Sequence, residues 1–278
     1  MPELPEVQTV VNTLSPRLLG RTICGVDHAR REVVRPCDFN LAGALRGRVV
    51  TGLTRRGKRI VFALDDGNRF YIHLGMSGRL TVERDDAPVQ PHTHLIVTLG
   101  PQQLRFVDPR RFGGVFWMGK DSDGADMGPE PLGLRVHQLA ERLSKTTRAI
   151  KNALLDQTLV AGLGNIYVDE SLFAAGIHPL APADKLSLED VRRLNRAIKV
   201  TLRRAIRHRG STLRDYVDAD GEAGGFQLLH RVYGRESQPC RACQTPIQRI
   251  VLGGRSTHFC PKCQKEKKRG LLRFACRG

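Results

Sequence analysis

The sequence has 278 residues, of which 45 are Lys or Arg and 28 are Asp or Glu, so its formal net charge is +17. This length suffices for one large domain or two of ordinary size, and a composition with 40% hydrophobic residues excludes a collagen, a coiled coil and a wholly disordered chain. The strong positive charge indicates a polyanionic partner, and favours nucleic acid over an anionic membrane surface.

The sequence contains no run of about 18 apolar residues, and Glu3 and Glu6 stand where a secretory signal needs an apolar segment. We therefore expect a soluble protein of the cytoplasm with no membrane partner. Four of the seven cysteines form one cluster, a pattern that fits a metal site in a reducing compartment better than a disulfide framework.

The first expected element is a helix over Val7 to Leu19, with apolar residues at helical spacing and Pro5 where a first turn tolerates proline. From Arg21 to Met118, short β-branched segments alternate with turn signals such as Asp66-Gly67-Asn68 and Gly100-Pro101. This pattern predicts an antiparallel β-sandwich or barrel on which the helix packs. The expected strands are Arg48 to Thr54, Arg59 to Leu64, Arg69 to Leu74, Arg79 to Glu83, Thr93 to Leu99 and Gln103 to Val107.

Residues 119–133 combine Gly, Asp and Pro without periodicity, which is typical of a linker. Beyond this segment the apolar spacing is helical, and Ser187 with Asp190 predicts a capping box at the start of the longest helix. The expected helices are Val136 to Leu143, Arg148 to Leu155, Ile166 to Ala175 and Leu188 to His208. The expected parts of the chain are domains 1–118 and 134–229, a zinc-binding region 230–264 and a basic extension 265–278.

The cysteine cluster has metal-ligand spacing. Two Cys-x2-Cys pairs, Cys240 with Cys243 and Cys260 with Cys263, are separated by sixteen residues. Two such pairs supply four soft ligands for one closed, tetrahedral Zn²⁺ site, which leaves no open position for water. The ion is therefore structural, and function belongs to what it supports. Between the pairs, residues 248–254 with Arg255 predict a two-stranded ribbon whose turn carries a cation, which suits a phosphate backbone.

Two further segments admit both a functional and a structural interpretation. Asn165, after a Gly-rich approach, is a predicted helix N-cap whose free amides suit a phosphate, although most such caps are only structural. Removal of Met1 would leave Pro2 as a secondary amine with a pKa near 7.7–8.0, able to attack a sugar carbon while Glu3 moves protons. By itself, an N-terminal Pro-Glu is more often simply the start of a helix.

Five motifs in chain order resemble the formamidopyrimidine-DNA glycosylase family. They are PELPEV at 2–7, HLGMSG at 73–78, DPRRFG at 108–113, LVAGLGNIY at 159–167 and RSTHFCPKCQ at 255–264. The resemblance implies an α+β fold with an N-terminal antiparallel β-sandwich domain, a helical domain with a helix-two-turn-helix motif and a C-terminal zinc-ribbon finger. It also implies a monomeric, nucleoid-associated base-excision repair enzyme. Such enzymes remove oxidised purines from duplex DNA, notably 8-oxoguanine and formamidopyrimidines, and cut the strand at the abasic site.

The resemblance assigns catalytic roles by position. Pro2 resembles the nucleophile that attacks C1′ and forms a Schiff base, and Glu3 resembles the proton donor and shuttle. Lys58 resembles the lysine that assists β-elimination and contacts phosphate. Arg255 resembles the arginine linked to δ-elimination and phosphate binding, so strand cleavage by β,δ-elimination is expected.

DNA-binding roles follow in the same way. An enzyme that acts on a base in a duplex must extrude it and fill the hole, and Met76, Arg110 and Phe112 resemble the filling residues. A thioether and a flat ring replace stacking, and guanidinium donors face the unpaired cytosine. Taken without the motifs, Met76 and Phe112 would be assigned to core packing. The expected phosphate contacts are His73, Lys151 and Asn165, with His92 close to DNA.

Some residues depart from the family pattern or match none of it. Gln8 stands where PELPEVE is common, the basic tail passes the usual end, and Cys24, Cys37 and Cys276 match no motif. Base recognition is expected to involve a flexible loop over residues 211–225. The alternatives are an endonuclease VIII-like enzyme for oxidised pyrimidines, a noncatalytic DNA-binding protein on the same scaffold, and a ribosomal or RNA-bound protein.

Overall fold

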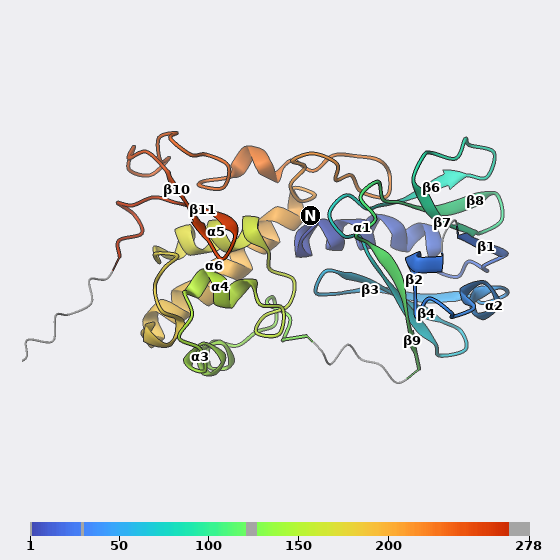
Figure 1. Ribbon diagram of the computed structural model, residues 1–278, viewed down its shortest axis with the longest axis horizontal. Coiled ribbons are helices and arrows are strands. Elements are labelled where there is room, and N and C mark those ends of the chain that lie inside the picture. Colours follow the sequence, from blue (N-terminus) through green and yellow to red (C-terminus); the bar gives the residue numbers. More distant parts are fainter. Residues whose placement is uncertain (1, 29–30, 121–126, 267–278) are drawn as a thin grey trace, which may run out of the picture.

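The computed structural model describes residues 2–28, 31–120 and 127–266. Figure 1 shows a half built of β-sheets and a half built of helices, with the amino terminus between them. The expected extension 265–278, with Cys276, lies outside the described residues except for Lys265 and Glu266. Among the described residues, no helix is both long and apolar enough to cross a membrane.

The sheet half contains two sheets. One has the strand order β1-β7-β8-β6 and the other has β2-β9-β5-β4-β3. Adjacent strands are antiparallel except β2 and β9, which pair in parallel over two residues. The bounds are β1 Gly25–His28, β2 Val34–Arg35, β3 Val50–Arg56, β4 Arg59–Leu64, β5 Arg69–His73, β6 Arg79–Arg84, β7 Thr93–Thr98, β8 Gln102–Val107 and β9 Gly114–Gly119. The sheet half also holds the short helix α2, Leu41–Leu45.

Helix α1, Leu4–Leu18, packs on both sheets through side chains such as Val7, Val10 and Leu14. The helix begins at Leu4, whereas the apolar spacing predicted a start at Val7. The backbone N–H of Glu3 donates to Glu6 Oε2 at 2.8 Å, which satisfies an amide that a helix start leaves unpaired.

The helical half has its own apolar core, formed mainly by α3 Val136–Ser144, α4 Ile150–Leu155, α5 Asn165–Ala175 and α6 Leu188–Arg207. The capping box expected at α6 is confirmed, because Asp190 N donates to Ser187 Oγ and Ser187 N to Asp190 Oδ2, both at 3.1 Å. At the carboxyl end, β10 Gln248–Leu252 and β11 Arg255–Phe259 form the expected two-stranded ribbon.

Each of the two apolar cores contains residues from a segment that mainly belongs to the other half. Leu4, at the start of α1, is fully buried in the helical core. In the opposite direction, Tyr216 and Ala219 leave the helical half and are buried in the sheet core. The backbone of this second segment is joined to β6, because Val82 N donates to Ala219 O at 3.3 Å. The two halves are therefore held together by a shared apolar seam.

Candidate catalytic and DNA-binding site

A pocket of about 390 Å³ opens beside Pro2, where the two halves meet. Pro2 is buried, and it lines the pocket together with Met76 and Arg110 from loops of the sheet half. The helical half contributes Ile166, Ser211, Leu213, Arg214, Asp215, Tyr216 and Tyr233. The structure thus brings the expected nucleophile, two of the expected hole-filling residues and the start of the expected recognition loop to one place.

Glu3 occupies the amino terminus of α5. Its carboxylate is buried and accepts hydrogen bonds from Ile166 N at 2.9 Å and Tyr167 N at 3.3 Å. The sequence-based expectation of Asn165 as the N-cap, with free amides for a phosphate, is wrong. The cap position is Gly164, Asn165 is the first helical residue, and a carboxylate of the same chain already takes these two amides.

Burial and the charge of the other residue shift the pKa values of both Glu3 and Lys58. Burial raises the pKa of Glu3, and the nearby Lys58 ammonium opposes the rise. Burial also lowers the pKa of Lys58, which Glu3 opposes and Arg255 reinforces. A carboxyl whose pKa is raised and an amine whose pKa is lowered therefore lie within reach of each other's charge, an arrangement that suits acid-base chemistry.

Sequence analysis missed a buried network around Glu6. The Glu6 carboxylate accepts from Ser211 N at 2.7 Å and from the hydroxyl of Tyr167. Ser211 Oγ lies 3.1 Å from His230 Nε2. Burial, with the neighbouring charge of Glu3, raises the pKa of Glu6 to about 7. A helical motif with Glu at this position gives no sign of these contacts, because the partners lie far away in the chain.

Two loops carry the expected hole-filling side chains, and they are held together by Asp108. Asp108 is fully buried and accepts from Ser77 Oγ at 2.6 Å and from Gly113 N at 2.7 Å. The loops cross so closely that a Cβ on Gly75, whose φ is +63°, would lie 2.5 Å from Gly113 N. This explains why the HLGMSG and DPRRFG motifs occur together.

The side chains at the tips of these loops are exposed. Met76 is 41% and Phe112 59% exposed, so neither belongs to a core. The Arg110 guanidinium lies 5.0 Å from the centre of the Phe112 ring. Met76 and Arg110 line the pocket, and Phe112 lies against Arg110, so a thioether, a guanidinium and an aromatic ring are presented close together.

The two expected histidines differ in setting. His73 Nδ1 accepts from Gly75 N at 3.1 Å, and burial and the nearby Lys58 lower its pKa. This places His73 near Lys58. His92 is exposed, with φ of +65°. Its carbonyl oxygen accepts a hydrogen bond from Asp108 N, so His92 is joined to the two loops that Asp108 holds together. The companion His94 is buried, with Nε2 2.9 Å from the carbonyl of Asp108.

The turn that carries Lys58 is fixed from the other half of the protein. Glu130 accepts from Gly57 N at 2.6 Å and forms an ion pair with Arg55 at 2.7 Å. Arg55 Nε also donates to Gln8 Oε1 at 3.0 Å. Gln8 is thus part of the support of this turn, and its neutral amide leaves the Arg55 charge paired with Glu130.

Lys151 and Asn165, expected at phosphates, both contact the ribbon. The Lys151 side chain is 0% exposed and donates to Asp169 Oδ1 at 2.7 Å and to Ser256 O at 2.8 Å. Asn165 Nδ2 donates to the same carbonyl at 2.9 Å. A fully buried ammonium in this arrangement does not reach a phosphate with its side chain. Arg255, one residue before Ser256, is exposed.

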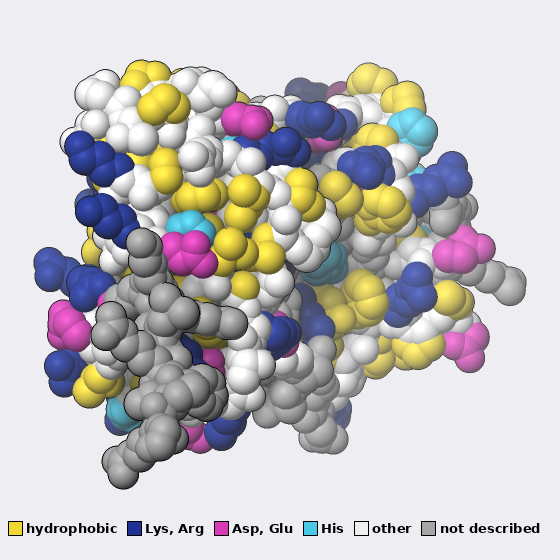
Figure 2. Space-filling model, turned by 60° about the vertical axis from the view of Figure 1, so that its left-hand side comes forward, with side chains coloured by type: hydrophobic (Ala, Val, Ile, Leu, Met, Phe, Trp, Pro, Cys, Tyr) yellow, Lys and Arg dark blue, Asp and Glu magenta, His cyan; other side chains and the backbone are white. Residues whose placement is uncertain are grey.

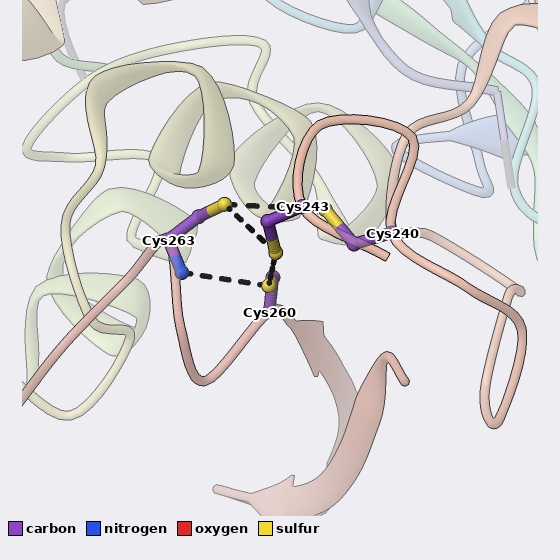
Figure 3. Close-up of side chains that lie close together, drawn as sticks. All are labelled: Cys240, Cys243, Cys260 and Cys263. Atoms are coloured by element: carbon purple, nitrogen blue, oxygen red, sulfur yellow. Dashed lines mark hydrogen bonds between the residues drawn. The ribbon is translucent and has the colours of Figure 1, made fainter. Parts of the chain in front are cut away.

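The four cysteines converge on one point, as Figure 3 shows. Their sulfur atoms all lie within 4.8 Å of one another, with Cys240 and Cys260 buried and Cys243 and Cys263 partly buried. Four thiol groups at this spacing have the number and the softness that a closed tetrahedral metal site requires. Cys24 and Cys37 are exposed and lie outside this cluster.

The excess of Lys and Arg in the sequence is visible on the surface of the protein. Lys and Arg side chains lie over both halves of the face drawn in Figure 2, interspersed with apolar side chains. A pocket lined by buried Pro2, with exposed stacking groups and cations near it, suits an enzyme that works on an extruded nucleotide.

Comparison with known proteins agrees with this class. Residues 1–115 match the model of the formamidopyrimidine-DNA glycosylase N-terminal domain, residues 127–217 match that of the H2TH domain of the same enzymes, and residues 237–265 match a zinc finger found in FPG and IleRS. The chain therefore belongs to the formamidopyrimidine-DNA glycosylase family, whose members are DNA-repair glycosylases with a zinc finger.

Relatives match over nearly the whole chain. The formamidopyrimidine-DNA glycosylase of Geobacillus kaustophilus is 45% identical, with 95% of this chain and 100% of the relative covered. That of Bacillus subtilis is 44% identical, with 96% and 100% covered. The Lactococcus lactis enzyme, solved with DNA containing an abasic site, gives a TM-score of 0.90 at 38% identity, with 95% and 100% covered. The fold expected from the sequence is confirmed.

Proposed function

We propose that the protein removes oxidised purines from duplex DNA and cleaves the resulting abasic strand by β,δ-elimination. The observation that carries this proposal is the position of Pro2 and Glu3, buried at the pocket between the two halves beside Lys58. Relatives support the substrate class, because one Lactococcus lactis structure contains Fapy-dG DNA and another contains an abasic site.

In this mechanism the amine of Pro2, freed by removal of Met1, attacks C1′ of the extruded nucleotide. The bond from C1′ to the base breaks, and the base leaves with the electron pair and takes up a proton. Burial raises the pKa of Glu3, so its carboxyl binds a proton more readily than a free carboxyl and can donate that proton to the sugar ring oxygen as the ring opens to the iminium. The iminium acidifies the C2′ proton, and loss of this proton expels the 3′ phosphate.

Lys58 and Arg255 act on the phosphates in this proposal. The lowered pKa of Lys58 increases the fraction of free amine that can assist β-elimination. Arg255 binds the 5′ phosphate, which leaves with the electron pair of the C5′–O bond when the C4′ proton is lost in δ-elimination. Met76, Arg110 and Phe112 fill the space left by the extruded base, and His73, His92 and Asn165 line the path of the strand.

The cysteine cluster holds one structural Zn²⁺ ion in this proposal. Cys240, Cys243, Cys260 and Cys263 supply its four ligands, and the ion would fix the ends of the β10-β11 ribbon, which carries Arg255. The predicted domain limits, the monomeric state and the nucleoid-associated location stay predictions.

Borohydride trapping tests the proposal. The purified protein is incubated with a duplex containing 8-oxoguanine opposite cytosine, with an oxidised-pyrimidine duplex and with an undamaged duplex. We expect a covalent adduct at Pro2 on the first duplex, and N-terminal sequencing should show that Met1 is absent. An adduct on the pyrimidine lesion alone would favour the endonuclease VIII-like alternative. Tight binding without any adduct, from protein that lacks Met1, would favour the noncatalytic alternative.

A further inference from the structure

We propose that the buried ion pair of Lys151 and Asp169 is a positioning device, which fastens the zinc ribbon to α5 and thereby sets the place of Arg255. The proposal rests on the proposed function, in which Arg255 acts on a phosphate. It gives Lys151 a role that the sequence did not indicate.

The contacts form two parallel links from the helices to strand β11. Lys151 Nζ, on α4, donates to Asp169 Oδ1 at 2.7 Å and to Ser256 O at 2.8 Å. Asp169 Oδ2, on α5, accepts from His258 N at 2.8 Å. The ion pair therefore forms hydrogen bonds with the backbone of β11 at Ser256 and at His258. Thr257, between these two residues, is fully buried.

Two more contacts restrict the same segment. Asn165 Nδ2 donates to Ser256 O at 2.9 Å, so that this carbonyl has two donors from the helical half. The ribbon turn passes close to α4, since a Cβ on Gly253 would lie 3.1 Å from Asn152 Oδ1. Arg255 lies in the chain between these two contacts, which hold its backbone against the helical half.

The energetics favour a positioning role over a stabilising one. Both side chains of the ion pair are 0% exposed, and the loss of hydration of two buried charges offsets most of their attraction. Well-packed apolar residues commonly give equal or greater stability at such sites. What apolar residues cannot supply is a directed hydrogen bond to Ser256 O and another from His258 N. The ion pair therefore affects mainly the position of β11 and has less effect on the free energy of unfolding.

The anchored position matters because Arg255 acts across the two halves. Its charge is among the causes that lower the pKa of Lys58, after burial, and it also lowers the pKa of Lys151. The charge of Arg255, although carried by the ribbon, therefore acts on Lys58 in the sheet half. A small displacement of β11 would separate Arg255 from the phosphate that Lys58 also approaches.

The first test compares Asp169→Asn with Arg255→Ala on a duplex with a preformed abasic site. The amide of asparagine turns a donor toward either Lys151 Nζ or His258 N, so one link to β11 is lost. We expect both variants to accumulate the β-elimination product at the expense of the β,δ product. Pro2-dependent borohydride trapping by Asp169→Asn should stay within about threefold of wild type. Glu141→Gln adds the same charge at an exposed ion pair on α3 and serves as the matched control.

The second test uses binding alone, so it does not depend on cleavage. The affinity for a duplex with a tetrahydrofuran abasic analogue is measured over a range of salt concentrations. Loss of one phosphate contact should reduce the magnitude of the salt slope by about one, in Asp169→Asn as in Arg255→Ala. If both residues act through one contact, the double variant is no weaker than Arg255→Ala. Equal slopes for wild type and Asp169→Asn, or additive losses, would overturn the positioning role.

An apolar replacement separates folding from positioning. The double variant Lys151→Met with Asp169→Leu removes both charges together and should keep the wild-type melting temperature within a few degrees, yet show the product pattern of Arg255→Ala. A folded double variant with the wild-type product ratio would overturn the inference even if Asp169→Asn fails to fold. If the wild-type protein itself leaves abasic DNA intact, the proposed function fails, and the salt slopes still decide the role of the pair.

Discussion

Single glycines decide whether the two buried carboxylates can reach their positions. A Cβ on Gly164 would lie 2.3 Å from Glu3 Cδ, and a Cβ on Gly210 would lie 2.6 Å from Glu6 Oε1. Both distances are far below van der Waals contact, and both carboxylates are enclosed by backbone donors that cannot retreat without loss of hydrogen bonds. A residue with a Cβ therefore does not fit at positions 164 and 210 while the two carboxylates keep their places.

We predict that Gly164→Ala reduces single-turnover excision of 8-oxoguanine by at least about tenfold. The new methyl group displaces the Glu3 carboxylate from Ile166 N and Tyr167 N, and each buried hydrogen bond lost costs about 1–3 kcal/mol. Gly133→Ala is the control, since its nearest atom would be 3.9 Å away and its φ is not positive. Equal rates for wild type and Gly164→Ala would show that the Glu3 position is not needed.

The pKa of Glu6 predicts a pH dependence of stability. Below pH 4.5 this carboxyl is protonated in both folded and unfolded chains, and its contribution is fully present. Because its pKa is raised to about 7 in the folded protein, this contribution is lost as the pH rises through 7, by about 3 kcal/mol in total. Glu6→Gln should flatten the free energy of unfolding between pH 4.5 and 7.5 by about this amount in urea titrations. Parallel curves for the two proteins would contradict the assignment.

Residues that carry a motif were predictable, and residues that complete it were not. Pro2 and Glu3 could be named because their motif, PELPEV, is compact in the chain. Glu6 meets Ser211 across 205 positions, and neither residue has a local pattern that indicates a partner. The role of Lys151 was missed for the same reason, since its contact with Ser256 spans 105 positions.

Among the elements, those with regular alternation were the ones the sequence indicated. All six expected strands correspond to β3 through β8, with ends that coincide or differ by at most two residues. Strand β9 reads Gly-Val-Phe-Trp-Met-Gly and lacks polar alternation, so it was not separated from its surroundings. The start of α5 was misassigned because a side chain from α1, distant in sequence, performs the capping that Asn165 was expected to perform.

The zinc ribbon is the element whose loss should be separable from the rest. Its core contains Val232, Ile247 and the cysteines with Phe173 of α5, and it is a cluster distinct from the main cores of the two halves. We predict that Cys243→Ser lowers metal content and weakens DNA binding by at least about tenfold, because the ribbon is no longer fixed. Fluorescence of Trp117, packed on Phe39 in the sheet half, should be unchanged. Cys37→Ser, at an exposed cysteine, is the control, and unaltered affinity in a zinc-free Cys243→Ser protein would contradict the role of the ribbon.

At the scale of the whole molecule, the seam makes the two halves interdependent. Leu4 belongs to the helical core although it begins the helix that fills the sheet core, and Tyr216 lies in the sheet core although it follows α6. Tyr216 also donates from its hydroxyl to Glu6 O at 3.2 Å, so the seam passes directly beside the site. A linker alone would allow each half to unfold separately, whereas exchanged core residues couple the unfolding of one half to that of the other.

This coupling predicts that a cavity in one half lowers the stability of both. Leu139 is fully buried in the helical core, and Leu139→Ala should reduce the free energy of unfolding by about 2–5 kcal/mol. The protein's one tryptophan, Trp117, reports on the sheet half, and circular dichroism at 222 nm reports mainly on the helices. We expect both signals to shift to the same lower urea midpoint. If Trp117 fluorescence keeps its wild-type midpoint while the helical signal moves, the halves unfold independently and the seam does not couple them.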